Sequence, residues 1–127
     1  MKINPVHMDH RGTITDILSK EEIDGVTIIH TESGEIRGNH YHKETTQWLY
    51  VLSGVVMVAF KAPGGEIETV IIEQGEMVKH NPMEVHAYLA LSATDWLVLT
   101  KGPRSGTDYE SDTFRVDAII HKLEVQP

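Results

Sequence analysis

Short apolar runs rich in valine and isoleucine recur along most of the chain, separated by glycine, proline, asparagine or serine. Each run has the length of a β-strand, and this spacing is typical of a β-sandwich or a closed barrel. The runs are residues 13–18, 26–31, 47–52, 55–61, 67–73, 86–91 and 96–100. Residues 62–66 (APGGE) predict a hairpin turn between two of them. We therefore expect an all-β fold.

Only the C-terminal part of the chain shows a different period. Val116, Ile119, Ile120 and Leu123 are spaced as one face of a helix. Residues 118–123 could equally extend a strand, so a short C-terminal helix and a further strand both remain open. The chain contains no internal repeat, low-complexity tract or linker, and its 127 residues match the size of one compact domain.

The charge balance argues against one class of partner. Lys plus Arg number 11 and Asp plus Glu number 19, so the formal net charge is −8. Proteins that follow a nucleic-acid backbone usually carry the opposite sign, and we expect no DNA or RNA partner. A small anionic ligand remains compatible, because a few Arg or Lys side chains in a cleft outweigh the global charge at close range.

The absence of cysteine excludes a disulfide framework and a thiolate metal site. Any metal ion must therefore be held by imidazole, carboxylate or amide groups. The N-terminal sequence MKINPVHMDHRG lacks the apolar core of a signal peptide, and no apolar run reaches membrane-spanning length. We expect a soluble, cytoplasmic protein that has no membrane partner.

Several histidines are placed in the sequence so that they could form one site. His40 and His42 are two residues apart, so on a regular strand they project from the same face. Gln47 begins the next apolar run, and His86 begins a later one. Three histidines and one amide can thus converge inside one barrel.

The spacing of these residues resembles the first sequence motif of the cupin superfamily. Gly34 is followed by five residues, His40-x-His42, four residues, Gln47, six residues and Gly54. Gln47 stands where most members of the superfamily have glutamate. The resemblance implies a jelly-roll barrel of two antiparallel sheets.

A second and looser resemblance follows further along the chain. The separation of Gly75 and His86 is similar to that in the second cupin motif, although Asn81 and Met83 replace its usual proline and inner glycine. Two motifs in the expected order imply that residues 1–127 form a single cupin domain.

A narrower resemblance points to sugar-nucleotide enzymes. Residues 37–43 (RGNHYHK), followed by Gln47, are similar to the signature of cupins that act as dTDP-4-keto-6-deoxyhexose 3,4-ketoisomerases. Related patterns occur in the cupin domains of capsule-sugar epimerases. Residues 9–12 (DHRG) are similar to the start of the ketoisomerase pattern, and Asp108-Tyr109-Glu110 falls near a position where that pattern also has Asp-Tyr. The resemblance implies a homodimer in which the two histidines of residues 37–43 move protons in a sugar pocket without a metal.

Isomerisation of a keto sugar needs a base that takes a proton beside the carbonyl, and an acid that returns one at the neighbouring position. Histidine titrates near neutral pH and can take either role, so we expect His40 and His42 to be the catalytic pair. Arg37 and Lys43 are the candidates that contact the diphosphate or the sugar oxygens, since arginine suits bidentate contact with phosphate. The resemblance thus implies a nucleotide sugar as the substrate.

A metal centre is the alternative for the same residues. Neutral imidazoles bind Zn, Ni, Fe or Mn well, and His40, His42 and His86 with Gln47 would leave positions open for substrate or water. Such an ion could polarise a carbonyl group or, as iron, activate oxygen. Neutral glutamine is a poorer ligand than glutamate, which favours a pocket that needs no cofactor, with Gln47 and His86 as substrate contacts. A cupin that binds a sugar without turning it over is the third interpretation.

Other notable side chains have ordinary structural interpretations. Tyr41 falls on the opposite face from the histidines and is expected to pack or to meet a dimer partner, because open barrels commonly cover an edge strand with a second copy. The remaining histidines have no partner at ligand spacing and are expected to be surface or packed residues. These are His7, His10, His30, His80 and His121.

Overall fold

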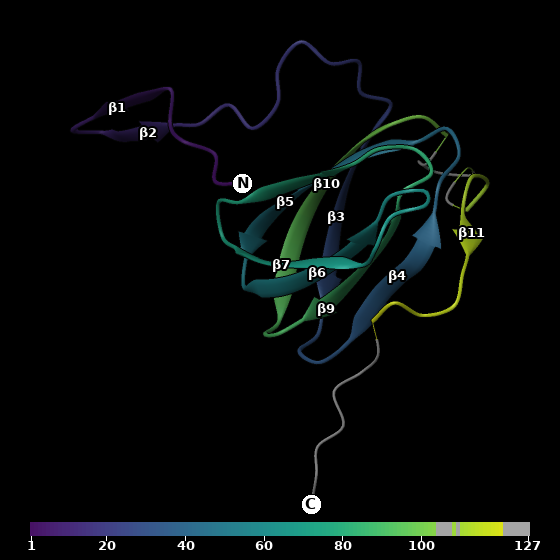
Figure 1. Ribbon diagram of the computed structural model, residues 1–127. Coiled ribbons are helices and arrows are strands. Elements are labelled where there is room, and N and C mark those ends of the chain that lie inside the picture. Colours follow the sequence, from purple (N-terminus) through teal and green to yellow (C-terminus); the bar gives the residue numbers. More distant parts are fainter. Residues whose placement is uncertain (104–107, 109, 121–127) are drawn as a thin grey trace, which may run out of the picture.

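The computed structural model describes residues 1–103, 108 and 110–120, and most of them lie in strands (Figure 1). The expectations stated above for Tyr109, His121 and Leu123 lie outside these residues. The described strands are β1 His7–Asp9, β2 Gly12–Ile14, β3 Gly25–Thr31, β4 Ile36–Tyr41, β5 Thr46–Ser53, β6 Val55–Lys61, β7 Glu68–Glu73, β8 Met77–His80, β9 Val85–Ala90, β10 Thr94–Lys101 and β11 Phe114–Arg115. Within that part of the chain, no helix has the length and apolar character needed to cross a membrane.

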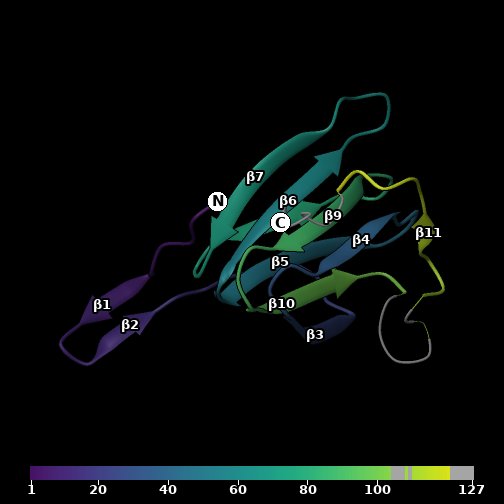
Figure 2. The same cartoon turned by 90° about the horizontal axis from the view of Figure 1, so that it is seen from below.

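Two large sheets form the body of the fold. One has the strand order β3-β10-β5-β8, the other has the order β11-β4-β9-β6-β7, and neighbouring strands are antiparallel throughout. Figure 2 shows the two sheets stacked face to face, with β3, β5 and β10 in one layer and β4, β6, β7 and β9 in the other. This arrangement confirms the predicted jelly-roll of two antiparallel sheets.

The core lies between these sheets because strands of both, such as β5 and β6, direct alternate apolar residues toward the opposite sheet. Its buried members are Leu49, Val51, Val56, Val58, Ile72, Tyr88, Trp96 and Val98. Full burial of one such side chain contributes about 1.5–3 kcal/mol. The alternation also means that the chemistry of the barrel interior depends on which residues of each strand face inward.

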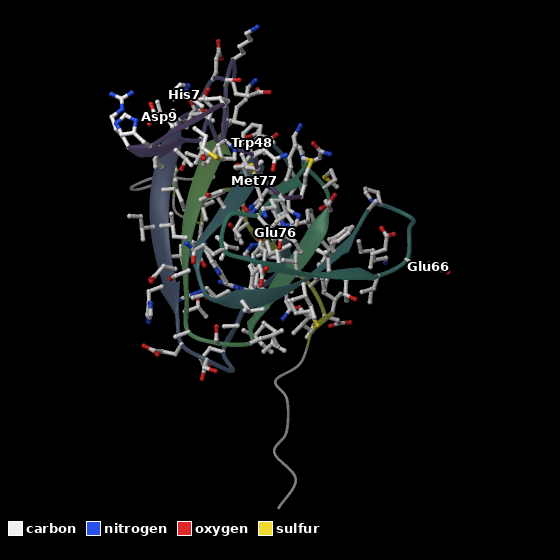
Figure 3. The ribbon with its side chains drawn as sticks, turned by 90° about the vertical axis from the view of Figure 1, so that its left-hand side faces the viewer. His7, Asp9, Trp48, Glu66, Glu76 and Met77 are labelled. Atoms are coloured by element: carbon white, nitrogen blue, oxygen red, sulfur yellow. The ribbon has the colours of Figure 1, made fainter. Side chains whose placement is uncertain are left out.

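The opposite face of the four-stranded sheet carries its own apolar cluster. Trp48, Met77 and Leu99 are buried there, and Ile17 and Leu18 of the N-terminal segment pack against them. Figure 3 shows Trp48 and Met77 close together near the N-terminal hairpin. The N-terminal segment therefore covers one sheet from the outside.

The predicted run at residues 13–18 is only partly a strand. Thr13 and Ile14 belong to β2, which pairs with β1 in a separate two-stranded sheet that projects from the barrel (Figure 1). The rest of the run is not in a strand, because Ile17 and Leu18 pack over the outer cluster instead of pairing with a neighbour. The apolar spacing predicted a strand for these residues, whereas the structure leaves them partly buried outside any strand.

The described part of the C-terminal segment, residues 116–120, is not helical. The backbone N–H groups of Ile119 and Ile120 donate to the Oδ1 atom of Asn39, at 2.8 and 3.3 Å. Ile120 is buried in a small cluster with Ala59, Ala87 and Leu89. Because the Asn39 side chain on β4 accepts hydrogen bonds from these two N–H groups, they do not donate to backbone carbonyl groups of a helix. This part of the apolar pattern therefore reflects docking against the five-stranded sheet.

Candidate functional site

A cavity of about 290 Å³ lies between the two large sheets. The wall that the four-stranded sheet contributes is largely apolar, with Leu49 and Trp96 among its residues. The opposite wall is formed by the five-stranded sheet and by the residues directly after β4. It contains Arg37, His40 and His42, which all border the cavity. The cavity therefore combines an apolar floor with a small number of polar groups, as ligand sites commonly do.

A bulge in β4 decides which of its side chains face this cavity. The pairing of β4 with β9 shifts between Gly38 and His40, and Gly38 and Asn39 both have positive φ angles, of 96° and 58°. Arg37 pairs with Tyr88 and His40 pairs with His86, so both face the interior although they are three residues apart. On a regular strand they would project from opposite faces.

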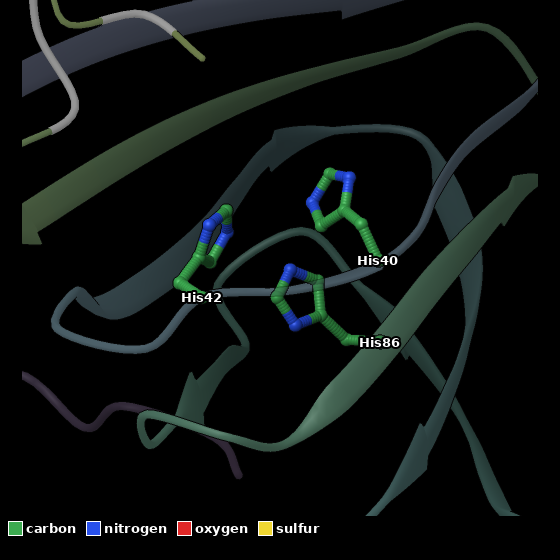
Figure 4. A group of neighbouring side chains, drawn as sticks. All are labelled: His40, His42 and His86. Carbon is green, nitrogen blue, oxygen red and sulfur yellow. The ribbon is translucent and has the colours of Figure 1, made fainter. Parts of the chain in front are cut away.

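The three histidines of the predicted site come together (Figure 4). Ring nitrogens of His40, His42 and His86 lie within 4.8 Å of one another, and their ring centroids are 4.8 to 5.1 Å apart. His40 and His42 border the cavity. His86 is 1% exposed and does not border it. Gln47 is buried and borders the cavity from β5.

Backbone carbonyl groups hold two of these rings. Nδ1 of His42 is 2.8 Å from the carbonyl oxygen of Asp112, and Nδ1 of His86 is 3.1 Å from that of Glu84. A carbonyl oxygen only accepts, so Nδ1 donates a proton in both contacts. Each neutral ring therefore carries its lone pair on Nε2, which can accept a proton or bind a metal ion.

The environment of His86 opposes a positive charge. Burial lowers the pKa of His86 well below its usual value, and the nearby rings of His80, His40 and His42 lower it further. A buried imidazole in such surroundings is neutral near pH 7. Neutral imidazole is the form that suits a metal ligand or a proton acceptor.

Arg37 is held by two hydrogen bonds from its guanidinium group. Nε donates to Oγ1 of Thr31 at 2.8 Å, and Nη2 donates to the carbonyl oxygen of His30 at 2.9 Å. Both acceptors lie at the end of β3, in the sheet opposite to β4. The guanidinium therefore bridges the two sheets at the border of the cavity.

Lys43, the second predicted anion contact, lies elsewhere. Its Nζ atom is 4.2 Å above the ring of Phe114, and the residue does not border the cavity. The ring of Tyr41 stacks on the same Phe114 ring, with centroids 5.4 Å apart. The structure thus separates Lys43 from Arg37 and places it against β11.

Three residues that sequence reasoning did not assign to the site lie beside the histidine cluster. His80 is 2% exposed, and its ring stacks on that of His86 with centroids 4.4 Å apart. Nδ1 of His80 is 2.6 Å from Oε1 of Glu84, and Asp112 holds His42 as described above. His80 is the last residue of the four-residue strand β8, and its inward position follows from the pairing of β8 with β5, where it lies opposite Gln47.

The cavity mouth also contains groups that were not predicted as site residues. Glu110, Thr113 and Arg115 border the cavity, and Nη2 of Arg115 forms an ion pair with Oε1 of Glu110. They come from the turn before β11 and from β11 itself, which is only two residues long. So short a strand has no detectable period.

A jelly-roll barrel that carries a histidine cluster beside an internal cavity defines a cupin. Residues 7–114 match the family described as the polysaccharide biosynthesis C-terminal domain, and the chain belongs to this family. No curated protein matches the chain in sequence.

Solved structures with the same fold include sugar 3,4-ketoisomerases and a dTDP-sugar epimerase. A double mutant of the 3,4-ketoisomerase QdtA from Thermoanaerobacterium thermosaccharolyticum, in complex with TDP, is 25% identical with a TM-score of 0.73, over 91% of this chain and 84% of that one. A 3,4-ketoisomerase from Helicobacter canadensis is 20% identical, with a TM-score of 0.74 over 91% and 87% of the two chains. The dTDP-4-dehydrorhamnose 3,5-epimerase from Sulfolobus tokodaii is 14% identical, with a TM-score of 0.71 over 90% and 77%.

Proposed function

We propose that this protein is an isomerase or epimerase that acts on a nucleotide-linked keto-deoxysugar, with His40 and His42 as the proton-transfer pair. The observation that carries the proposal is that both rings border one cavity, 4.8 Å apart, opposite an apolar wall. The likeness to ketoisomerases and an epimerase of dTDP-sugars supports the same class of substrate.

Proton transfer between neighbouring carbon atoms accounts for the chemistry. One histidine takes the proton from the hydroxyl-bearing carbon beside the keto group, and the other donates a proton to the carbonyl oxygen, which gives an enediol. The former keto carbon then receives a proton from one histidine while the neighbouring hydroxyl group loses its proton to the other, so the carbonyl group moves to the neighbouring carbon. His42 suits the role of base because its Nδ1–H bond to Asp112 leaves the Nε2 lone pair available. This route needs no cofactor.

Substrate recognition follows from the two walls of the cavity. Arg37 is the candidate for the diphosphate, because a guanidinium fixed by Thr31 and His30 can present its remaining N–H groups without reorganising. The amide of Gln47 can contact a sugar hydroxyl. An apolar wall suits the methyl group of a deoxysugar better than a hydroxymethyl group. Lys43 does not border the cavity and is not part of this proposal.

A metal-dependent enzyme is the second candidate, and one observation favours it. Three imidazoles with nitrogen atoms within 4.8 Å of one another fit a Zn, Ni, Fe or Mn ion, with His40, His42 and His86 as ligands and Gln47 as a weak fourth. The Nδ1–H bonds of His42 and His86 to backbone carbonyls are the kind of contact that orients metal-bound histidines. A bound divalent ion would supply Lewis-acid polarisation of the substrate carbonyl.

Solvent-deuterium exchange tests the proposed function directly. The wild-type protein should incorporate deuterium from D₂O into TDP-4-keto-6-deoxyglucose or a related keto sugar, and His40→Asn and His42→Asn should abolish incorporation while keeping the fold. His10→Asn, at an exposed position, is the matched control and should exchange as the wild type does. Undiminished exchange in both active-site variants would rule out the assignment.

Two further measurements separate the alternatives. Elemental analysis of the purified protein decides the metal: a stoichiometric divalent ion, lost in His86→Asn, would favour the metal-dependent candidate. A thermal-shift panel of nucleotide sugars reports binding independently of turnover, because a ligand that binds only the folded state raises the unfolding temperature. Binding without exchange would identify a sugar-binding cupin in place of an enzyme.

The proposed assembly is a homodimer. On the edge strand β3, Val26 and Ile28 are 65% and 69% exposed, and Met8 and Ile14 of the projecting β1–β2 hairpin are also exposed. A two-stranded hairpin is marginally stable by itself, and an apolar edge strand favours pairing with another chain. A second copy of the chain is the occupant that we propose for this edge.

A further inference from the structure

Asp112 is connected to the segment that follows His42. Its carboxylate accepts hydrogen bonds from the backbone N–H groups of Lys43, Glu44 and Thr45, at 3.0, 2.8 and 3.0 Å, and from the Thr45 hydroxyl at 3.0 Å. Asp112 and Thr45 are both buried. Hydrogen bonds to a carboxylate are stronger than those between neutral groups, so this one side chain determines the course of residues 43–45.

The backbone of the same residue controls the ring of His42. The Asp112 carbonyl accepts the Nδ1–H of His42 at 2.8 Å, across a sequence separation of 70 residues. In the absence of such a contact, neutral imidazole can carry its proton on either nitrogen. Loss of this contact would therefore let the proton move to Nε2, and the lone pair that a base needs would be lost from that atom.

We propose that Asp112 is a positioning residue for His42. Its carboxylate fixes residues 43–45, which brings its own carbonyl to the His42 ring, and the carbonyl keeps the proton on Nδ1 and the lone pair on Nε2. Glu110, Thr113 and Arg115 flank Asp112 and border the cavity. The segment 110–115 thus forms part of the substrate wall and also sets the protonation pattern of the base. The catalytic part of this proposal rests on the proposed function.

Asp112→Asn tests the proposal because it replaces one acceptor oxygen by an NH₂ group that faces backbone donors. We expect kcat for deuterium exchange to fall by about 100-fold, since small displacements of a catalytic group have effects of that order. KM should change by less than about 3-fold, because Asp112 itself does not border the cavity. In ¹⁵N-edited spectra of the imidazole groups, His42 should change from the Nδ1–H form to a mixture containing the Nε2–H form.

Thr45→Val is a milder second variant, because it removes one of the four hydrogen bonds and keeps the buried volume nearly unchanged. It should show a smaller shift in the same direction. Ser111→Ala is the matched control on the same turn: its hydroxyl is exposed and bonds only to the Asp108 and Pro103 carbonyl groups among the described residues. This variant should keep the wild-type spectrum and rates.

The ¹⁵N-edited spectrum of the His42 ring tests the role of Asp112 even if the wild-type protein catalyses no deuterium exchange. His42→Asn identifies the His42 signals by their loss. A His42 ring that stays fully in the Nδ1–H form in both Asp112→Asn and Thr45→Val would overturn the proposal, and so would a wild-type ring in the Nε2–H form. If Asp112→Asn fails to fold, Thr45→Val alone decides. A missing activity with the expected change of tautomer would refute only the proposed function.

Discussion

The ring of His80 lies flat against the ring of His86, with centroids 4.4 Å apart and planes 15° from parallel. One residue, Glu84, contacts both: its carboxylate holds Nδ1 of His80 and its carbonyl accepts from Nδ1 of His86. The short segment between β8 and β9 therefore holds the rings of His80 and His86 in place. His80 takes no part in the proposed chemistry but supports a residue that does.

Replacement of His80 by alanine should lower the free energy of unfolding by about 2–4 kcal/mol. The change removes a buried side chain and leaves the Glu84 carboxylate, itself largely buried, without its partner. Urea denaturation measures the difference. His10→Ala, at an exposed position, should change stability by less than about 0.5 kcal/mol. An equal effect of the two substitutions would contradict the supporting role of His80.

Gly38→Ala should destabilise the protein more than Gly34→Ala, although both glycines have positive φ angles, of 96° and 85°. A Cβ atom at Gly38 would lie 2.7 Å from the carbonyl oxygen of His86, whereas nothing lies within 4 Å of one at Gly34. We expect a loss of about 1 kcal/mol at Gly34 from backbone strain alone. At Gly38 we expect about 2–4 kcal/mol, because overpacking adds to the strain.

Thermal denaturation of the two glycine variants under identical conditions makes this comparison. Gly38→Ala should also weaken deuterium exchange, because the bulge that turns Arg37 and His40 to the same face would have to move. Similar stability losses in the two variants would mean that β4 and β9 can separate at the bulge without cost.

Arg37→Met should weaken the binding of dTDP by about 10- to 100-fold, which corresponds to the loss of a charge-assisted hydrogen bond. Arg37→Lys should recover only part of the affinity, because an ammonium group cannot reproduce the bidentate contact. Isothermal titration calorimetry provides the dissociation constants. Lys79→Met is a charge-matched control, since Lys79 lies over the Trp48 ring on the outer face. Equal weakening by the control would point to a general charge effect.

His30 should titrate above its usual pKa of 6.5. Hydrogen bonds to Asp95 and to Glu32, at 2.8 and 3.0 Å, raise the pKa of His30 by favouring the charged ring. Because the folded-state pKa is the higher one, the stabilisation is complete below pH 6.5 and is lost as the pH rises through the folded-state pKa. An NMR titration of the His30 ring measures this pKa, and Asp95→Asn should lower it. No change in the variant would exclude the pair as the cause.

Sedimentation of the wild-type protein should show a dimer, and Ile28→Lys should shift the equilibrium toward the monomer. A lysine on an edge strand disfavours pairing with another chain. Ile71→Lys, on the edge strand of the other large sheet, is a control of similar exposure, with Ile28 and Ile71 at 69% and 59%. A wild-type monomer at all concentrations, or equal dissociation in the two variants, would place the interface elsewhere or exclude it.

Local patterns in the sequence predicted most of the strands and the position of the main motif. The runs at residues 47–52 and 55–61 are almost the whole of β5 and β6, because alternating apolar residues on these strands face a common core. β4 is harder to detect, since its residues are mostly polar and its period is broken at Gly38 and Asn39. Arg37 was predicted as a substrate contact from its motif, yet on a regular strand it would have faced away from His40.

The sequence by itself determined that this chain forms β-strands and that the histidines near residue 40 form a close pair, because strand alternation and short spacings are local properties. Only the tertiary structure decided that His86 joins them, that His80 supports His86, and that Asp112 holds His42. These contacts depend on the pairing of β4 with β9, of β5 with β8, and on where the turn before β11 docks. Such long-range contacts are set by the packing of the whole barrel, which no short segment encodes.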